Sequence, residues 1–92
     1  MKATINGKRY DSDNCHTLAS YDHQNNGNYS GTTYLIEASN GELLKHTNSN
    51  GQDCYLRNSL FIWDSHQAPI DEFDDLKDKE RLVQLGIIEI ID

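Results

Sequence analysis

The sequence predicts an α+β fold in a single domain, an antiparallel sheet of five or six short strands with one C-terminal helical segment. The first observation is that Asn-Gly pairs at Asn6-Gly7, Asn40-Gly41 and Asn50-Gly51 separate short runs of strand-forming residues. Asn-Gly is the strongest local signal for a type I′ hairpin, because both central residues of that turn need positive φ. The second is that helical spacing of apolar residues occurs only near the C-terminus. The third is length, since 92 residues support one core but not two.

The N-terminal third is expected to contribute a hairpin and a further strand. Residues 2–11, KATINGKRYD, place Asn6-Gly7 in the turn, with Ala3, Ile5 and Tyr10 sharing the core face. Residues 15–23 alternate with a period of two, which favours a strand over a short helix. Residues 24–31, QNNGNYSG, are polar or Gly around Tyr29 and are expected to form a loop or a long hairpin connection.

Residues 32–58 are expected to form a three-strand meander around the other two Asn-Gly pairs. Two-residue turns would set Ala38 opposite Leu43, Thr47 opposite Cys54, and Lys45 opposite Ile36 on one side and Leu56 on the other. Because strand side chains alternate between faces, this register gathers the better core face from Tyr34, Ile36, Ala38, Leu43, Cys54 and Leu56. The opposite, exposed face then contains Leu35, Glu37, Leu44, His46, Tyr55 and Arg57.

Two apolar runs flank the expected helix. Residues 60–63, LFIW, are continuous and apolar, as in a strand that is covered on both faces. Trp63, at the end of this run, is expected to pack beneath the helix that follows. Residues 87–91, IIEII, are a final strand candidate.

The helical segment is expected over residues 69–86. Pro69 suits the first helical position, and Gly86 suits the left-handed C′ position of a Schellman motif in which Ile87 contacts Leu82. The apolar residues between these ends do not stay on one face. This drift indicates a bend or two short helices, with Asp78 as the second N-cap.

The formal net charge of −7 is concentrated at the C-terminal end. Residues 1–63 hold six acids and five bases, whereas residues 64–92 hold nine acids and three bases. Eight Lys and Arg residues spread along the chain do not form the basic patch that direct nucleic-acid binding needs. The sequence also lacks a signal-peptide apolar region and any run of roughly 18 to 20 apolar residues. We therefore expect a cytoplasmic protein that does not bind a membrane.

Chemically reactive side chains are few and carry no metal-binding or catalytic motif. Cys15, His16, His46 and Cys54 contain no Cys-x-x-Cys or His-x-x-x-His spacing, and so they predict neither a metal site nor a cofactor. In a reducing compartment both cysteines are expected to be free thiols. A domain of this size built from hairpins has little room for a deep pocket, so we expect no enzyme activity.

Two groups of residues are candidates for binding a partner. The first is an acidic stretch without any base before Lys77, which is either a solvated helix start or a negative surface that attracts a basic partner. Its members are Asp64, Asp71, Glu72, Asp74 and Asp75. The second group contains candidate hot-spot residues, namely Tyr29, Leu44 and Tyr55.

The heptapeptide INGKRYD at residues 5–11, the loop GNYSG at residues 27–31 and the Gly-centred hairpin after it resemble small phage and mobile-element accessory proteins of the anti-CRISPR kind. The resemblance is one of sequence over about the first eleven residues and one of architecture beyond them. It implies a protein that blocks a CRISPR-Cas effector complex by binding directly to a basic, nucleic-acid-binding surface. The alternatives are an immunity protein or antitoxin that covers a basic nuclease toxin and, from another class, a small hydrolase or metal-binding domain.

Overall fold

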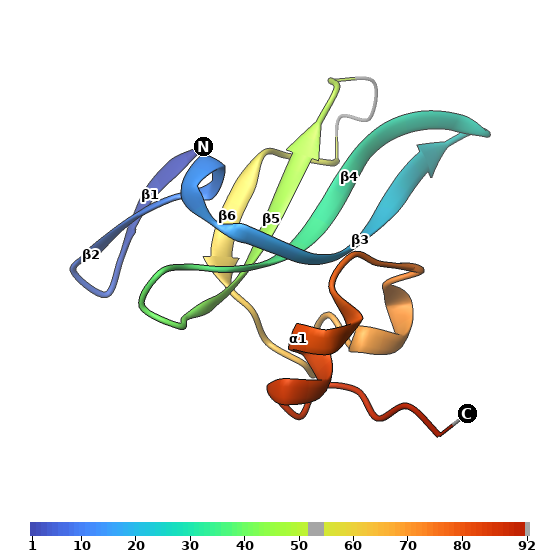
Figure 1. The fold of residues 1–92 in the computed structure, drawn as a ribbon. Helices are drawn as coiled ribbons and strands as arrows, with labels where there is room; N and C mark the ends of the chain where they lie inside the picture. The colour runs from blue at the N-terminus through green and yellow to red at the C-terminus, as the bar shows by residue number, and fades with distance from the viewer. Residues whose placement is uncertain (52–54, 92) are drawn as a thin grey trace.

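The computed structural model describes residues 1–51 and 55–91 and confirms the α+β class. The chain forms a five-stranded antiparallel sheet and a separate two-stranded hairpin at the N-terminus. Figure 1 shows the hairpin beside the sheet and the short helix α1 near the C-terminus. No helix among the described residues is long and apolar enough to cross a membrane. In chain order the elements are β1 (Lys2–Ile5), β2 (Lys8–Asp11), the 3₁₀ helix η1 (Ser12–Asn14), β3 (His16–Asn25), β4 (Asn28–Glu37), β5 (Leu43–Ser49), β6 (Ser59–Ile62), the 3₁₀ helix η2 (Ile70–Glu72), β7 (Asp75–Leu76) and α1 (Lys79–Gln84).

The sheet separates two hydrophobic cores, so the expectation that a chain of this length supports only one core is wrong. Its strands lie in the order β6-β5-β4-β3-β7, with β4 in the centre. Leu35 and Ile36 are adjacent in β4 and point to opposite faces, and both are buried. Leu35 packs in the core formed with the C-terminal segment, whose other buried members are Leu18, Ala19, Ala68, Phe73 and Leu82. Ile36 packs in the core formed with the β1–β2 hairpin, whose other buried members are Tyr10, Ala38, Leu44 and Leu60.

Two-residue turns close two of the hairpins. Between β1 and β2, Asn6 and Gly7 have φ of +52° and +76°, as a type I′ turn requires and as the sequence predicts. Between β3 and β4, Asn26 and Gly27 have φ of +54° and +80° and form the same kind of turn. Residues 24–31 are therefore mostly strand rather than the expected loop or long hairpin connection, because this Asn-Gly pair lets both long strands run up to the turn.

The β4–β5 hairpin has a three-residue loop, residues 39–41, and this loop changes the expected register. The amide of Gly41 donates to the carbonyl of Ala38 at 2.9 Å. Gly41 itself has a φ of +86°, the left-handed conformation that follows a type I turn in such loops. The extra residue moves the pairing by one position, so that Leu44 rather than Lys45 lies opposite Ile36. The faces expected for β5 are therefore wrong.

The β5–β6 hairpin pairs residues further along the chain than expected. Lys45 lies opposite Phe61, and Thr47 lies opposite Ser59. The expected pairing of Thr47 with Cys54 across a tight Asn50-Gly51 turn is therefore wrong, and the connection extends over residues 50–58. Cys54 lies outside the described residues.

β6 is an edge strand with one buried side chain. Leu60 is 4% exposed in the core under the β1–β2 hairpin, and burying a leucine is worth about 1.5 to 3 kcal/mol, which favours this pairing over the tight turn. Phe61 and Ile62 are 58% and 36% exposed, so the expectation that this run is covered on both faces is wrong. Trp63 leaves the strand and donates from Nε1 to the carbonyl of Ala68 at 2.8 Å.

β7 replaces the middle of the expected helix. Leu76 pairs with Ala19 at the edge of β3. The amides of Lys77 and Asp78 both donate to the carbonyl of Leu18, at 2.9 and 3.1 Å. These backbone bonds satisfy a sheet edge and outweigh the helix preference of this segment. The helical segment is thus divided into η2 before the strand and α1 after it, one of the arrangements that the drift of apolar residues indicates.

α1 begins and ends as the sequence predicts. Asp78 is its N-cap, with Oδ1 accepting from the amide three residues later at 3.0 Å. Gly86 has a φ of +74°, and the amide of Ile87 donates to the carbonyl of Leu82 at 3.0 Å, which completes the Schellman motif. Residues 87–91 form no strand, so that expectation is wrong; the Schellman turn instead directs Ile87 and the residue after it against the C-terminal core.

Gly41→Val is expected to destabilise the protein by about 1 to 3 kcal/mol, because a β-branched residue is strained at the positive φ of this loop. Space is not the cause, since a Cβ at Gly41 meets no atom within 4 Å. Chemical denaturation measures the change. Gly41→Asn is the control and should lose much less stability, because Asn tolerates the left-handed region. A valine variant as stable as the parent would contradict the loop conformation.

Candidate functional site

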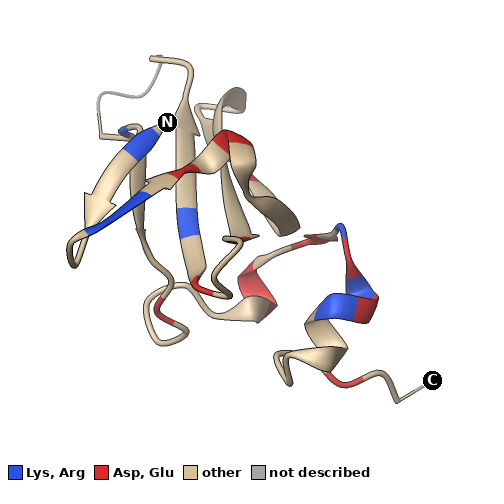
Figure 2. Cartoon of the chain, turned by 60° about the vertical axis from the view of Figure 1, so that its left-hand side comes forward, with Lys and Arg blue, Asp and Glu red and all other residues tan. Residues whose placement is uncertain are grey.

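The acidic stretch lies on the chain between β6 and the end of β7, outside any long helix. Asp64 opens a turn in which its Oδ1 accepts from the amide of His66 at 2.9 Å. Figure 2 shows Asp and Glu along this part of the chain, whereas the β1–β2 hairpin carries Lys and Arg. The remaining members are all exposed, with Asp71 and Glu72 in η2, Asp74 after it and Asp75 in β7.

Most of these carboxylates are not neutralised by the protein itself. Asp75 is the exception, since its Oδ2 lies 2.6 Å from Nζ of Lys77. This hydrogen-bonded pair raises the pKa of Lys77 above its usual value. The other four make no ion pair with a described residue. We call these four the acidic segment: Asp64, Asp71, Glu72 and Asp74.

The candidate hot-spot residues do not join the acidic segment. Leu44 is fully buried, so its assignment to an exposed binding face is wrong, and the one-residue change of register is the cause. Tyr29 is 50% exposed beside the β3–β4 turn, with its hydroxyl 2.7 Å from Oγ1 of Thr32. Tyr55 is 92% exposed in the connection between β5 and β6. In Figure 1 the β3–β4 turn lies at the end of the sheet away from α1.

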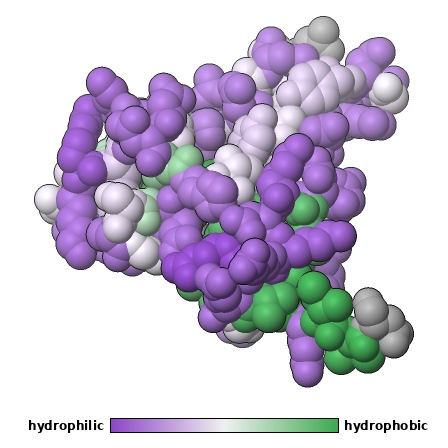
Figure 3. Space-filling model, viewed as in Figure 1, coloured by the Kyte–Doolittle hydropathy of each residue, from purple (hydrophilic) through white to green (hydrophobic). Residues whose placement is uncertain are grey.

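Exposed apolar side chains gather at the C-terminus. Ile90 and Ile91 are 58% and 78% exposed. Figure 3 shows the hydrophobic C-terminal end beside a largely hydrophilic surface. These residues follow the Schellman turn and extend beyond the core that the preceding isoleucines enter.

Two side-chain contacts, one of them an ion pair, fasten α1 to the sheet. Arg81 donates from Nε and Nη2 to the two carboxylate oxygens of Glu37, at 2.8 and 2.7 Å, in the bidentate geometry that gives strong charged hydrogen bonds. The Glu37 side chain is only 11% exposed, so water screens this pair weakly. His16 Nε2 lies 2.6 Å from Oδ2 of Asp78. No local sequence pattern indicates either contact.

These contacts lower the pKa of both carboxylates. The pKa of Glu37 lies below its usual value mainly because the hydrogen bonds from Arg81 stabilise the ionised form. The pKa of Asp78 is lowered mainly by the Arg81 amide that it caps, and then by His16. A carboxylate whose pKa is lowered by folding adds stability above its unfolded pKa, and that stability is lost as the pH falls through the folded pKa. Acid therefore weakens the junction between α1 and the sheet.

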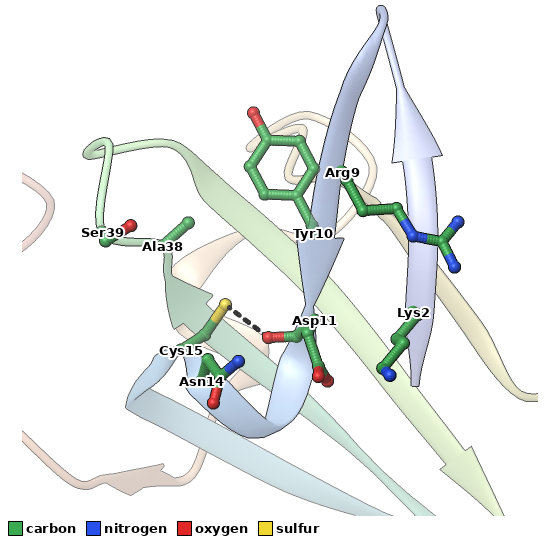
Figure 4. Close-up of a pocket in the computed structure, with 8 residues that line it drawn as sticks. All are labelled: Lys2, Arg9, Tyr10, Asp11, Asn14, Cys15, Ala38 and Ser39. Carbon is green, nitrogen blue, oxygen red and sulfur yellow. Dashed lines mark hydrogen bonds between the residues drawn. The ribbon is translucent and has the colours of Figure 1, made fainter.

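Cys15 lines a pocket of about 450 Å³ between the β1–β2 hairpin and the end of β4 (Figure 4). Its Sγ donates to the carbonyl of Asp11 at 3.3 Å. Burial, and then the charge of Asp11, raise the pKa of this thiol, so it is protonated at neutral pH and is a weak nucleophile. None of the described residues that line the pocket is a histidine, so the thiol has no imidazole base there.

The side chains considered as metal ligands lie in separate environments. His16 is bonded to Asp78, and His46 stacks on Tyr34 with ring centroids 5.8 Å apart. Burial lowers the pKa of His46. Within residues 1–51 and 55–91, no group of three or more His, Cys, Asp or Glu is placed to hold a metal ion.

The structure also contains an open groove that the expected register does not reveal. It lies on the sheet face where Lys45 sits opposite Phe61. The sequence does show that Tyr21 and His23 share a face of their strand. The pairing of Lys45 with Phe61, however, depends on the lengths of the loops on either side of β5, and an Asn-Gly pair does not specify those lengths. No protein-family model, curated protein or solved structure matches this chain. The exposed side chains are therefore the basis for assigning a function.

Arg81→Met is expected to lower the melting temperature by several degrees at neutral pH, because the nearly buried carboxylate of Glu37 loses two charged hydrogen bonds. The deficit should shrink as the pH falls through the folded pKa of Glu37, since the parent then also loses the ionised pair. Thermal unfolding followed by circular dichroism from about pH 7 to about pH 3 measures both effects. Lys79→Met, at an exposed base of the same helix, is the control. A deficit that stays constant across this range would contradict the role of the pair.

EDTA and dithiothreitol are each expected to leave the melting temperature unchanged, because Cys15 is a free thiol and the sequence predicts no metal site. Scanning calorimetry with and without each reagent measures this. A decrease of several degrees with EDTA would favour the metal-binding alternative. A similar decrease with dithiothreitol would indicate a structural disulfide.

Proposed function

We propose that this protein is a non-enzymatic phage or mobile-element inhibitor that binds a CRISPR-Cas effector complex in the host cytoplasm through its acidic segment. The observation that carries the proposal is the set of four exposed carboxylates without an ion-pair partner among the described residues. The resemblance of residues 5–11 and 27–31 to anti-CRISPR proteins supports the choice of target.

The charge of the acidic segment suits a basic partner. Two of the three bases in residues 64–92, Lys77 and Arg81, are already paired with other carboxylates. The acidic segment therefore keeps its negative potential. Effector complexes hold the guide–target duplex in a positively charged channel, and carboxylates bound to such a surface compete with nucleic-acid phosphates. Opposite charges also accelerate association.

The backbone of the acidic segment is held against the sheet, which lowers the entropy cost of binding. Near its start, Nε1 of Trp63 donates to the carbonyl of Ala68 at 2.8 Å. Between Glu72 and Asp74, Phe73 is 4% exposed and makes a T-shaped contact with Tyr21, with ring centroids 5.0 Å apart. Immediately after the segment, β7 pairs with β3. The carboxylates therefore project from a pre-organised surface.

Charge reversal of the acidic segment is expected to abolish inhibition. The parent should restore plaque formation by a targeted phage in a host with an active CRISPR-Cas system. The variant Asp71→Lys/Glu72→Lys/Asp74→Lys should bind the purified effector more than about tenfold more weakly, because each close interfacial charge pair can couple by about 1.5 kcal/mol or more. Its stability should change by only about 0.5 kcal/mol per site or less, as is usual for exposed positions.

The matched control reverses three acids elsewhere, Asp13, Glu42 and Glu89, and has the same net charge as the test variant. It should bind the effector as tightly as the parent. Equal binding by the two triple variants would contradict the acidic segment as the interface. A parent that restores no infection but binds and neutralises a basic nuclease toxin would replace the proposal with the immunity-protein alternative.

A further inference from the structure

The sheet face that holds Leu35 is covered by the C-terminal segment at one end only. At the other end an open groove of about 480 Å³ is lined by side chains of β3, β4, β5 and β6 and by residues 55–58. Small-molecule sites commonly occupy about 300 to 1,000 Å³, so the groove has the size of a ligand site. It is separate from the acidic segment, none of whose members lines it.

Strand pairing fixes the order of side chains across the groove. Lys45 lies directly opposite Phe61, so both project from the same face with Cβ atoms about 4.5 to 5.5 Å apart. The Phe61 ring is 58% exposed. The groove therefore presents an ammonium group beside an accessible aromatic surface.

The described lining of the groove carries two cationic side chains although the protein is acidic. Lys45 and Arg57 both line it, and neither forms an ion pair with a described residue. Of the described lining residues, none is Asp or Glu. Screening by salt limits the repulsion from carboxylates further than about 8 Å away, so the local cations dominate the groove.

A chain of polar side chains forms the floor of the groove. His23 Nε2 lies 2.6 Å from Oγ1 of Thr33, which lies 2.9 Å from Oγ1 of Thr47. Thr33 and Thr47 are 1% and 6% exposed. Because both hydroxyl groups are buried and bonded to each other, they fix the floor of the groove and leave contacts with a ligand to its exposed lining residues.

We propose that the groove binds a nucleoside phosphate. Lys45 and Arg57 contact the phosphate, because a cationic pair is the usual protein recognition for that group. Phe61 stacks on the planar base, since every base has a π-face that an aromatic ring accepts. Asn58, an exposed polar residue of the lining, hydrogen-bonds the sugar or the edge of the base. This site goes beyond the inhibitor function and does not depend on it.

A single nucleotide fits these observations better than a nucleic-acid strand. The groove holds two cationic side chains, whereas a strand needs a longer positive track along its backbone. The net charge of −7 opposes a polyanion more than a ligand with one phosphate.

Titration calorimetry with AMP, adenosine, inorganic phosphate and the oligonucleotide dT10 tests this site. AMP should bind the parent with a stoichiometry of one, at least about tenfold tighter than adenosine or phosphate alone, because it engages both parts of the groove. Lys45→Gln should weaken AMP binding about tenfold, and Phe61→Leu, which keeps an apolar side chain without the π-face, about fivefold or more. AMP-induced NMR shifts in the parent should centre on Lys45, Thr47 and Phe61.

Matched controls keep the result independent of folding and of the inhibitor function. Lys79→Gln removes an exposed base elsewhere, and Ile62→Leu changes the neighbouring β6 residue on the opposite face; both should bind AMP as the parent does. The charge-reversed acidic-segment variant should also bind AMP at least as tightly as the parent. Absence of AMP binding, NMR shifts centred elsewhere, equal binding by Lys45→Gln, or tighter binding of dT10 than of AMP would each overturn the assignment.

Discussion

The register of β4 is the constraint on which the other features depend. Leu35 and Ile36 enter different cores, so a one-residue slip would exchange the two faces of the strand. The loop that contains Gly41 brings Leu44 beside Ile36 and turns Lys45 to the other face. The same alternation places Glu37 on the face of Leu35, where Arg81 reaches it. One register therefore sets the cores, the attachment of α1 and the cation of the groove.

Turns and helix ends that depend on only a few neighbouring residues can be predicted from the sequence. The type I′ turn at Asn6-Gly7, the cap at Asp78 and the left-handed Gly86 need only local backbone geometry. Asn40-Gly41 also predicts a hairpin, but the same dipeptide fits both a two-residue turn and the three-residue loop seen here. Burial of side chains far along the chain decides between them, as Leu60 does for β6.

The candidate interface is readable from the sequence only in part. The acidic residues can be recognised in the sequence, whereas the ion pairs that they form depend on the fold. Asp75 and Lys77 are two positions apart, and they pair because the chain is extended through β7 and bends after it, whereas the expected helix would separate them. Glu37 and Arg81 are 44 residues apart, and no periodicity or motif links them. The sequence places Leu44 on the wrong face of its strand, because that face depends on the length of the β4–β5 loop.

Tyr21 is the side chain that joins the two proposed binding surfaces. It lines the groove beside His23, with ring centroids 4.9 Å apart, and it makes a T-shaped contact with Phe73, which lies between two carboxylates of the acidic segment. A substitution at Tyr21 therefore disturbs both surfaces at once and does not separate their functions. Lys45 and Phe61 line only the groove, and Asp71 and Asp74 belong only to the acidic segment. Such paired substitutions distinguish two independent sites from one surface that is coupled through an aromatic contact.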